Sequence, residues 1–194
     1  QAYSEAYLLS DACRLPDHLK QQLKTGDIRL YAGKSFEYSA LRSQGCALPE
    51  HLKQMIFDLD EQQEERFASL DRLPVVLCHR DFWIENIFAT DGGILLIDWD
   101  TAGWGYAGED IASLIIDETE PGCVDSYIRK LIPAYRQGLA EFADVSGIDE
   151  GRILDLILIK FGYRMVQTYL FSDSFDVKQE QVNLLQLLYD HRSR

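Results

Sequence analysis

Two short apolar runs on either side of residues 91–93, Asp-Gly-Gly, constrain the fold of this 194-residue chain more than any other feature. Residues 87–89 read Ile-Phe-Ala, and residues 94–97 read Ile-Leu-Leu-Ile. An Asp-Gly pair between two β-forming runs is the strongest short-range indication of a hairpin. In a hairpin that folds about the first of the two glycines, Asn86 lies six residues before the turn centre and Asp98 six residues after it. We therefore expect the side chains of Asn86 and Asp98 to face each other across the ladder.

The residues before this hairpin bring a third oxygen-bearing side chain to its open end. An apolar β-branched run at residues 75–77 leads into the polar sequence His79-Arg80-Asp81. Mg²⁺ prefers oxygen ligands and takes one or two protein side chains together with substrate phosphates and waters. Asn86 and Asp98 form such a pair, and Asp81 lies next to them on the incoming loop. The sequence therefore predicts a Mg²⁺ site made by Asn86 and Asp98.

The spacing of these residues indicates phosphoryl transfer. A His-Arg-Asp sequence, an Asn five residues after the Asp, and a further Asp at the end of a strand form the pattern of the kinase catalytic loop. Here the pattern comprises His79-Arg80-Asp81, Asn86 and Asp98, with twelve residues from Asn86 to Asp98. No Asp-Phe-Gly, long activation segment or Ala-Pro-Glu follows in the sequence. We therefore expect a kinase that acts on a small molecule rather than on a protein.

Residues 79–88, HRDFWIENIF, and residues 95–112, LLIDWDTAGWGYAGEDIA, resemble the aminoglycoside phosphotransferase family, which includes choline-kinase-like and other small-alcohol kinases. The resemblance implies an α+β, mostly helical fold: the C-terminal lobe of a protein-kinase-like structure with a small catalytic β-hairpin. It also implies transfer of the terminal phosphate of ATP or GTP to a hydroxyl of a small molecule, such as an aminoglycoside or another amino alcohol. In the family's pattern Asp81, His79 and Asn86 are the catalytic-loop residues, Asn86 and Asp98 hold Mg²⁺ and the nucleotide, and Asp110 braces the loop.

The difference in pKa between a hydroxyl group and an Asp side chain limits the role of Asp81. The pKa of water is about 15.7 and that of a free Asp about 3.9, so Asp81 cannot deprotonate an alcohol fully before transfer. A loose, metaphosphate-like transition state removes the difficulty, because the hydroxyl need only be aimed and its proton accepted late. Asp81 is therefore mainly a positioning group. His79 is a second candidate, since His is the commonest general base. Its place directly after a buried strand favours a structural imidazole that hydrogen-bonds the loop and holds Asp81.

Three further residues near the loop bear on the phosphate acceptor. Trp83 and Glu85 face either the substrate or the core. Glu85 beside a cationic amine, with Trp83 offering a π face, would suit an aminoglycoside or a quaternary ammonium alcohol. Asp100 either adds negative charge around the metal or caps the following turn. The sequence departs from the family where Ile84-Glu85 replaces a common Pro-Gly and Tyr106-Ala107 a common Asp-Pro.

Composition limits the partners. The net charge of −13 disfavours a nucleic-acid or anionic-membrane partner and would favour a cationic substrate, although acidity also serves solubility alone. The four cysteines are scattered with no Cys-x-x-Cys pair, so neither a zinc site nor a disulfide framework is indicated. No apolar run is long enough to span a membrane, and no signal-peptide pattern opens the chain. We expect a soluble, cytoplasmic protein.

The order of motifs suggests that part of the kinase is missing. Neither a glycine-rich strand-loop nor a Val-Ala-Ile-Lys-like strand stands before residue 75. We therefore interpret residues 1–194 as the C-terminal lobe alone, without the N-terminal lobe that covers the nucleotide, and we expect this fragment by itself to be inactive. The alternative is a catalytically inactive kinase-like module with a binding or scaffolding role.

Apolar periodicity predicts a helical remainder. The helix that opens at Pro49-Glu50 has its apolar stripe at Leu52, Met55, Ile56 and Leu59, and the charge run at 60–66 after it is expected to be a solvated face. The other expected segments are two short helices in 3–23 broken at Pro16, an irregular or mixed segment at 25–48, a short buried helix at 110–116, a helix at 124–142 kinked near Pro133, a central helix at 153–171 and a last helix at 182–189.

Overall fold

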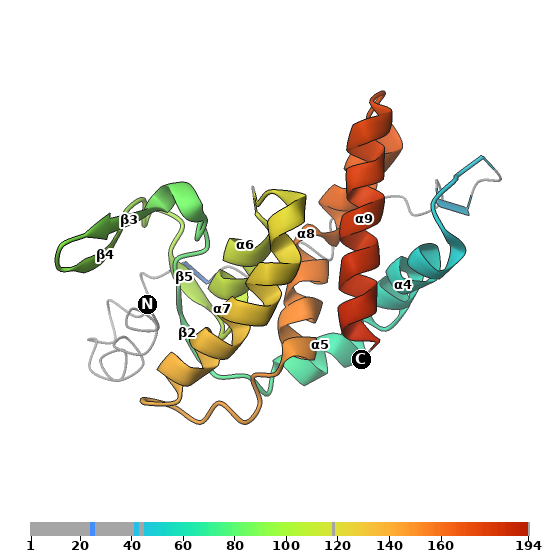
Figure 1. Ribbon diagram of the computed structural model, residues 1–194. Coiled ribbons are helices and arrows are strands. Elements are labelled where there is room, and N and C mark those ends of the chain that lie inside the picture. The colour runs from blue at the N-terminus through green and yellow to red at the C-terminus, as the bar shows by residue number, and fades with distance from the viewer. Residues whose placement is uncertain (1–23, 26–40, 43–44, 118, 194) are drawn as a thin grey trace.

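The computed structural model describes residues 24–25, 41–42, 45–117 and 119–193. Within these ranges the chain is mostly helical, with two small sheets beside the helices (Figure 1). This confirms the expected α+β, mostly helical fold class. The helices predicted in 3–23 and most of the segment 25–48 lie outside the described residues.

Most of the helices overlap the predicted segments. In chain order they are α4 (Glu50–Glu61), α5 (Gln63–Leu70), α6 (Glu109–Ile116), α7 (Val124–Leu139), α8 (Glu150–Phe171) and α9 (Phe175–Arg192), with the 3₁₀ turns η2 (Ile84–Asn86) and η3 (Pro121–Cys123). Helix α5 was not predicted as a separate helix, α7 ends three residues before the predicted end, and α9 is longer than the predicted segment at 182–189. The buried residues of α4 are Leu52, Met55, Ile56 and Leu59, the predicted stripe. Among these described helices, none is long and apolar enough to cross a membrane.

Helix α8 forms the centre of the helical body and packs against α4, α5, α6, α7 and α9. Its N-terminus is capped by Asp149, whose carboxylate accepts a hydrogen bond from the Arg152 amide at 2.8 Å. A run of buried aliphatic residues on several faces then provides the apolar surface for all five neighbours. The prediction of a central helix is thus confirmed, and the helix begins a few residues earlier than predicted.

The charge run at 60–66 is not wholly solvated, which corrects the prediction. Arg66 is only 8% exposed. Its guanidinium donates to Asp155 of α8 at 2.9 Å, and Arg192 of α9 lies 3.0 Å from the same carboxylate oxygen. A buried guanidinium requires such a partner, and this partner is 89 residues away in the sequence.

A buried histidine in α9 joins three helices. The two ring nitrogens of His191, in α9, lie 2.8 Å from Asp125 of α7 and 2.8 Å from Glu150 of α8. Each contact places a ring nitrogen of His191 against a carboxylate oxygen, so this one side chain links α9 to both α7 and α8. The hydrogen bond from His191 holds the pKa of Asp125 below its ordinary value.

The two sheets lie at one side of the helical body (Figure 1). In the three-stranded sheet, β5 (Gly103–Tyr106) lies between β1 (Lys24–Thr25), which is parallel to it, and β2 (Val75–Cys78), which is antiparallel. The second sheet is the predicted hairpin of β3 (Ile87–Thr90) and β4 (Gly93–Leu96). Strand β2 therefore ends beside the start of β5, and the catalytic segment leaves the sheet there.

The hairpin differs from the prediction by one residue of register. Ile87 pairs with Leu96 and Thr90 with Gly93, so the loop consists of Asp91 and Gly92 and its centre falls between them. Continuing this register, Ile97 lies opposite Asn86, and its amide donates to the Asn86 carbonyl at 3.2 Å. The expectation that Asn86 and Asp98 face each other across the ladder is therefore wrong, although both residues lie at the open end of the hairpin.

Candidate active site

The loop that follows β2 is fixed by a carboxylate from α6. Asp110 accepts hydrogen bonds from the backbone amides of His79, at 2.7 Å, and Arg80, at 2.9 Å. Asp110 is buried, and burial raises its pKa, whereas the two backbone hydrogen bonds and nearby Lys160 act in the opposite direction. Asp110 thus braces the loop, as the resemblance implies.

Arg80 adopts a backbone conformation that an L-residue rarely takes. Its φ is 70°, in the left-handed region, which costs about 1–2 kcal/mol for a residue with a Cβ. The guanidinium donates to the carbonyl of Trp104 in β5, and this contact helps to hold the residue. Such strain persists only where the surroundings impose it, and it is common at functional sites.

Asp81 and Asn86 are in direct contact. The Asn86 amide nitrogen donates to the Asp81 carboxylate at 2.9 Å and to the Asp81 carbonyl at 2.8 Å. Because both partners are acceptors, the amide nitrogen must point toward Asp81, and the amide oxygen of Asn86 is left to contact a ligand. The η2 turn that ends at Asn86 produces this contact, and Asp81 remains partly open to solvent.

Asp98 lies at the other side of the hairpin end. It is exposed, and its φ of 63° is again left-handed. Its side chain has no hydrogen bond within the described residues to Asp81 or Asn86, so the fold brings the loop pair together but ties Asp98 to neither. Continuing the hairpin register places Asp98 opposite Glu85, directly beside the Asn86–Ile97 pair.

His79 connects the loop to the segment that carries Asp98. The imidazole is 1% exposed, and its Nε2 donates to the carbonyl of Ile97 at 2.8 Å. The ring also contacts Trp99 and Phe82, with centroids 4.5 and 5.9 Å away. Nδ1 is buried without a hydrogen-bond partner. These contacts fit a structural imidazole, but one that holds the Asp98 segment, whereas the sequence predicted a contact with Asp81.

A buried polar cluster beneath the loop was not predicted from the sequence. Lys160 of α8 is 7% exposed, and its ammonium donates to the Arg80 carbonyl at 3.2 Å and to the Ser113 hydroxyl at 2.6 Å. Burial lowers the pKa of Lys160, while Asp110 and Glu109 act to raise it. For the acid Glu109, burial has the opposite effect and raises the pKa. Its carboxylate accepts a hydrogen bond from the Tyr106 amide at 2.7 Å. The single lysine within an otherwise aliphatic stretch of α8 is the feature that could have revealed this cluster.

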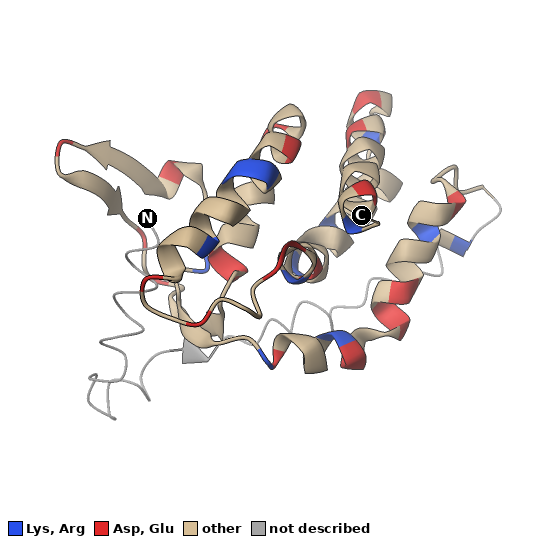
Figure 2. Ribbon diagram, turned by 60° about the horizontal axis from the view of Figure 1, so that its bottom comes forward, with Lys and Arg blue, Asp and Glu red and all other residues tan. Residues whose placement is uncertain are grey.

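The surroundings of the loop are acidic and open. Glu85, Asp98 and Asp100 are exposed, and Trp83 is half-buried. Figure 2 shows Asp and Glu positions on the hairpin as well as along the helices. Such an environment can accept a cationic group, and Mg²⁺ is one such group.

The donor set allows a cation ligand pair but no larger protein site. Among the described residues, no group of three His, Cys, Asp or Glu side chains is placed to hold a metal ion. The amide oxygen of Asn86 and the carboxylate of Asp98 are oxygen donors of the type that Mg²⁺ uses when phosphates and waters complete its coordination. The residues present therefore fit a Mg²⁺ that is bound together with a nucleotide.

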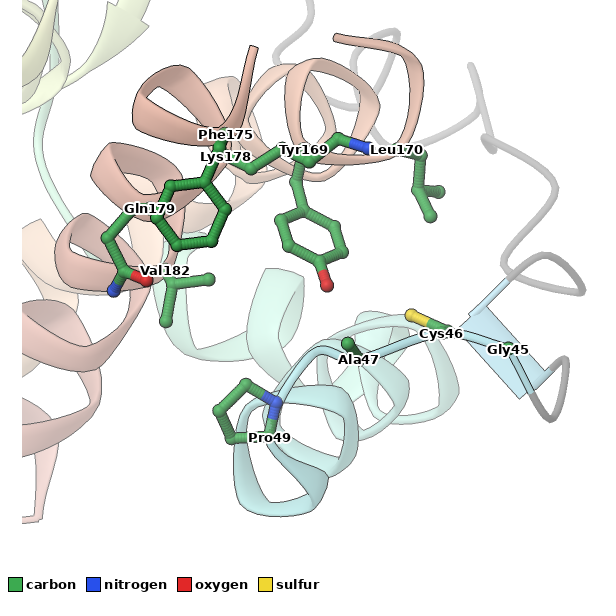
Figure 3. A pocket seen from close by; sticks show the side chains of 10 residues that line it. All are labelled: Gly45, Cys46, Ala47, Pro49, Tyr169, Leu170, Phe175, Lys178, Gln179 and Val182. Atoms are coloured by element: carbon green, nitrogen blue, oxygen red, sulfur yellow. The ribbon is translucent and has the colours of Figure 1, made fainter. Parts of the chain in front are cut away.

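The cavity in Figure 3 lies apart from this loop. It has a volume of about 570 Å³ and is lined by the segment before α4, the end of α8 and the start of α9, including Pro49, Tyr169 and Phe175. None of its lining residues belongs to the catalytic loop or the hairpin. The candidate active site is thus separate from this cavity.

Three solved structures are among those similar to this chain. Ethanolamine kinase from Plasmodium vivax is similar in structure, with a TM-score of 0.51, 22% identity, and coverage of 86% of this chain and 49% of that chain. Choline kinase from Cryptosporidium parvum Iowa II gives a TM-score of 0.44 and 15% identity over 86% of this chain and 55% of that chain. Spectinomycin phosphotransferase, solved with ADP and spectinomycin, has a TM-score of 0.42 and 15% identity. The match covers 93% of this chain and 61% of that chain. The likeness to the ethanolamine kinase shows a shared fold.

The matched residues show which part of the chain resembles known proteins. The chain spans about half the length of the ethanolamine kinase. No curated protein matches the chain significantly. The model of the phosphotransferase enzyme family matches residues 11–143, which is more than half of the 194 residues and includes the loop and the hairpin. The chain therefore belongs to the phosphotransferase enzyme family.

Proposed function

We propose that the protein transfers the terminal phosphate of ATP or GTP to a hydroxyl of a small molecule, with Asp81, Asn86 and Asp98 as the residues of the site. The observation that carries the proposal is the contact between the Asn86 amide and the Asp81 carboxylate, at 2.9 Å, at the end of a strand whose exit is braced by Asp110. Membership of the phosphotransferase family supports the reaction class.

Asp81 acts on the acceptor hydroxyl in this proposal. The hydrogen bond from Asn86 occupies one lone pair of Oδ2, and the rest of the carboxylate can accept the hydroxyl proton. In the transfer, the hydroxyl oxygen forms a bond to the phosphorus as the bond to the bridging oxygen breaks, and the proton passes to Asp81 late. His79 contributes indirectly, because its imidazole fixes the Ile97 carbonyl next to Asp98.

Asn86 and Asp98 are the proposed Mg²⁺ ligands. The metal, when bound, would neutralise charge on the nucleotide phosphates. Asn86 supports two functions with one amide: its nitrogen orients Asp81, and its oxygen is available to the metal. We also propose that a separate lobe completes the nucleotide site, because the chain spans only 49% of the ethanolamine kinase.

The acceptor is proposed to be an amino alcohol or an amino sugar. Glu85, Asp98 and Asp100 are exposed near the loop, and the chain has a net charge of −13, so a cationic amine would be attracted to the site. The half-buried Trp83 offers an aromatic face for such a cation.

The test uses the full-length protein. Wild type and Asp81→Asn would be assayed for Mg²⁺-dependent nucleotide consumption with ethanolamine, choline, aminoglycosides, sugars and homoserine as acceptors. We expect turnover with at least one cationic acceptor, and a loss of about 10²–10⁴-fold in kcat in Asp81→Asn with little change in nucleotide binding.

The matched control is Asp91→Asn, which makes the same chemical change at the exposed far end of the hairpin. Near-wild-type turnover in Asp81→Asn would reject the assignment. Metal-independent nucleotide binding with no turnover on any acceptor would instead favour a catalytically inactive binding module.

A further inference from the structure

We propose that Lys160 is a positioning residue for the phosphoryl transfer: its ammonium group holds the peptide that links Arg80 to Asp81 and so aims the Asp81 carboxylate. This inference rests on the proposed function. It concerns a residue of α8 that lies 80 positions after the loop it contacts.

The contact acts on the peptide bond immediately before Asp81. The Arg80 carbonyl that accepts from Lys160, at 3.2 Å, belongs to the same planar peptide unit as the Asp81 amide. Fixing this carbonyl therefore fixes the direction in which the chain enters Asp81. The Asn86 amide then holds the carboxylate from its other side, at 2.9 Å.

The contact with Lys160 helps to hold Arg80 in its left-handed conformation. The amide of Arg80 is held by Asp110 at 2.9 Å and its carbonyl by Lys160, so both peptide units around the left-handed α-carbon are clamped. A left-handed conformation is unfavourable for a residue with a Cβ, so Arg80 relaxes to an ordinary conformation when nothing holds it. Loss of the Lys160 clamp therefore allows the peptide to turn, and with it Asp81.

The positive charge of Lys160 also stabilises the buried carboxylates beneath the loop. Glu109 and Asp110 are buried beside it, and the ammonium is the cation of α8 that interacts with both. Ser113 anchors the ammonium from α6 at 2.6 Å, and its hydroxyl donates onward to the Glu109 carbonyl at 3.1 Å. A neutral side chain of the same length would leave the two carboxylates without this partner.

The decisive variant is Lys160→Met in the full-length protein, because methionine keeps the volume and removes both donor and charge. A misplacement of about 1 Å near reacting atoms costs about 100-fold in rate. We expect kcat to fall by about 10–100-fold while the KM values for MgATP and the acceptor stay within about twofold. Lys160→Arg should restore part of the loss, since a guanidinium can donate to the same carbonyl.

Two further variants separate positioning from stability. Leu158→Ala truncates a fully buried side chain of the same helix, two residues before Lys160, and it should destabilise the fold while kcat stays near wild type. Ser113→Ala removes the anchor of the ammonium without removing its charge. It should lower kcat less than Lys160→Met does, again without changing KM. Equal losses of kcat in Leu158→Ala and Lys160→Met at matched stability would overturn the proposal.

A readout that needs no turnover keeps the two proposals distinct. Hydrogen–deuterium exchange of the loop at 79–86 should be about tenfold faster in Lys160→Met and unchanged in Leu158→Ala, if the clamp holds the loop closed. Unchanged exchange in Lys160→Met would overturn the positioning role whether or not the protein is a kinase. Faster exchange in Lys160→Met, together with no turnover of the wild-type protein on any acceptor, would keep the clamp and reject the proposed function.

Discussion

Gly105→Ala should lower the free energy of unfolding by displacing the buried Glu109 carboxylate beneath the catalytic loop, although the glycine lies in a regular strand. Gly105 belongs to β5 and does not have a positive φ, so an alanine could adopt its backbone conformation. The obstacle is space: a Cβ at this position would lie 2.7 Å from Oε1 and 2.8 Å from Cδ of Glu109. The Glu109 carboxylate, itself buried, must therefore move.

The magnitude follows from the bond that this movement breaks. Glu109 accepts from the Tyr106 amide at 2.7 Å, and a hydrogen bond to a charged group contributes about 1.5–3 kcal/mol. The displaced carboxylate also has to remain buried, because Glu109 is only 4% exposed. We expect a loss of about 2–4 kcal/mol in the free energy of unfolding.

The assay is urea unfolding of the full-length protein followed by circular dichroism, with Gly147→Ala as the control, since the nearest atom to a Cβ there is 3.9 Å away. A double-mutant cycle identifies the cause. In a Glu109→Asp background the carboxylate is one methylene shorter, so adding Gly105→Ala should cost less than about 1 kcal/mol. The same cost of Gly105→Ala in both backgrounds would refute the clash with Glu109.

Two further predictions concern Asp98 and Asp155. Asp98→Gly should abolish turnover while the free energy of unfolding stays within about 1 kcal/mol of wild type, because glycine accepts the left-handed φ of 63° without strain; a large loss of stability on urea unfolding would contradict this. Burial raises the pKa of Asp155 to about 6, so the folded chain keeps a proton that the unfolded chain loses near pH 4, and this contribution to stability is present below about pH 4 and lost as the pH rises through 6. Between pH 4 and 7 the free energy of unfolding of wild type relative to Asp155→Asn should therefore fall by up to about 3 kcal/mol, and a constant difference across that range would contradict the raised pKa.

Local pattern was sufficient for the hairpin and for most of the helices. The Asp-Gly pair and its flanking apolar runs predicted the hairpin, and the apolar stripe of α4 appears at the predicted positions. These features depend on near neighbours in the sequence, so a periodicity or a turn dipeptide is enough to indicate them. The contact of Asp81 with Asn86 is of the same kind, since five residues and one 3₁₀ turn separate the two side chains.

Register could not be read from the same pattern. Placing the turn centre on Gly92 or half a residue before it leaves the strands in place but decides whether Asn86 lies opposite Asp98 or opposite Ile97. The side-chain period of a strand is two residues, so a slip of one changes every partner. The hydrophobic runs on both strands tolerate either choice. The two-residue loop at Asp91-Gly92 and the backbone hydrogen bond from Ile97 to Asn86 select the register that the structure has.

The sequence by itself determined which side chains are candidates for the chemistry: a carboxylate at 81, an amide at 86 and a second carboxylate at 98, in the order of a phosphoryl-transfer loop. Only the tertiary structure decided how that loop is held. The brace from Asp110 and the clamp from Lys160 come from helices 30 and 80 residues away. A buried charge is stable only where the fold supplies its partner, and a partner at that distance leaves no local pattern in the sequence.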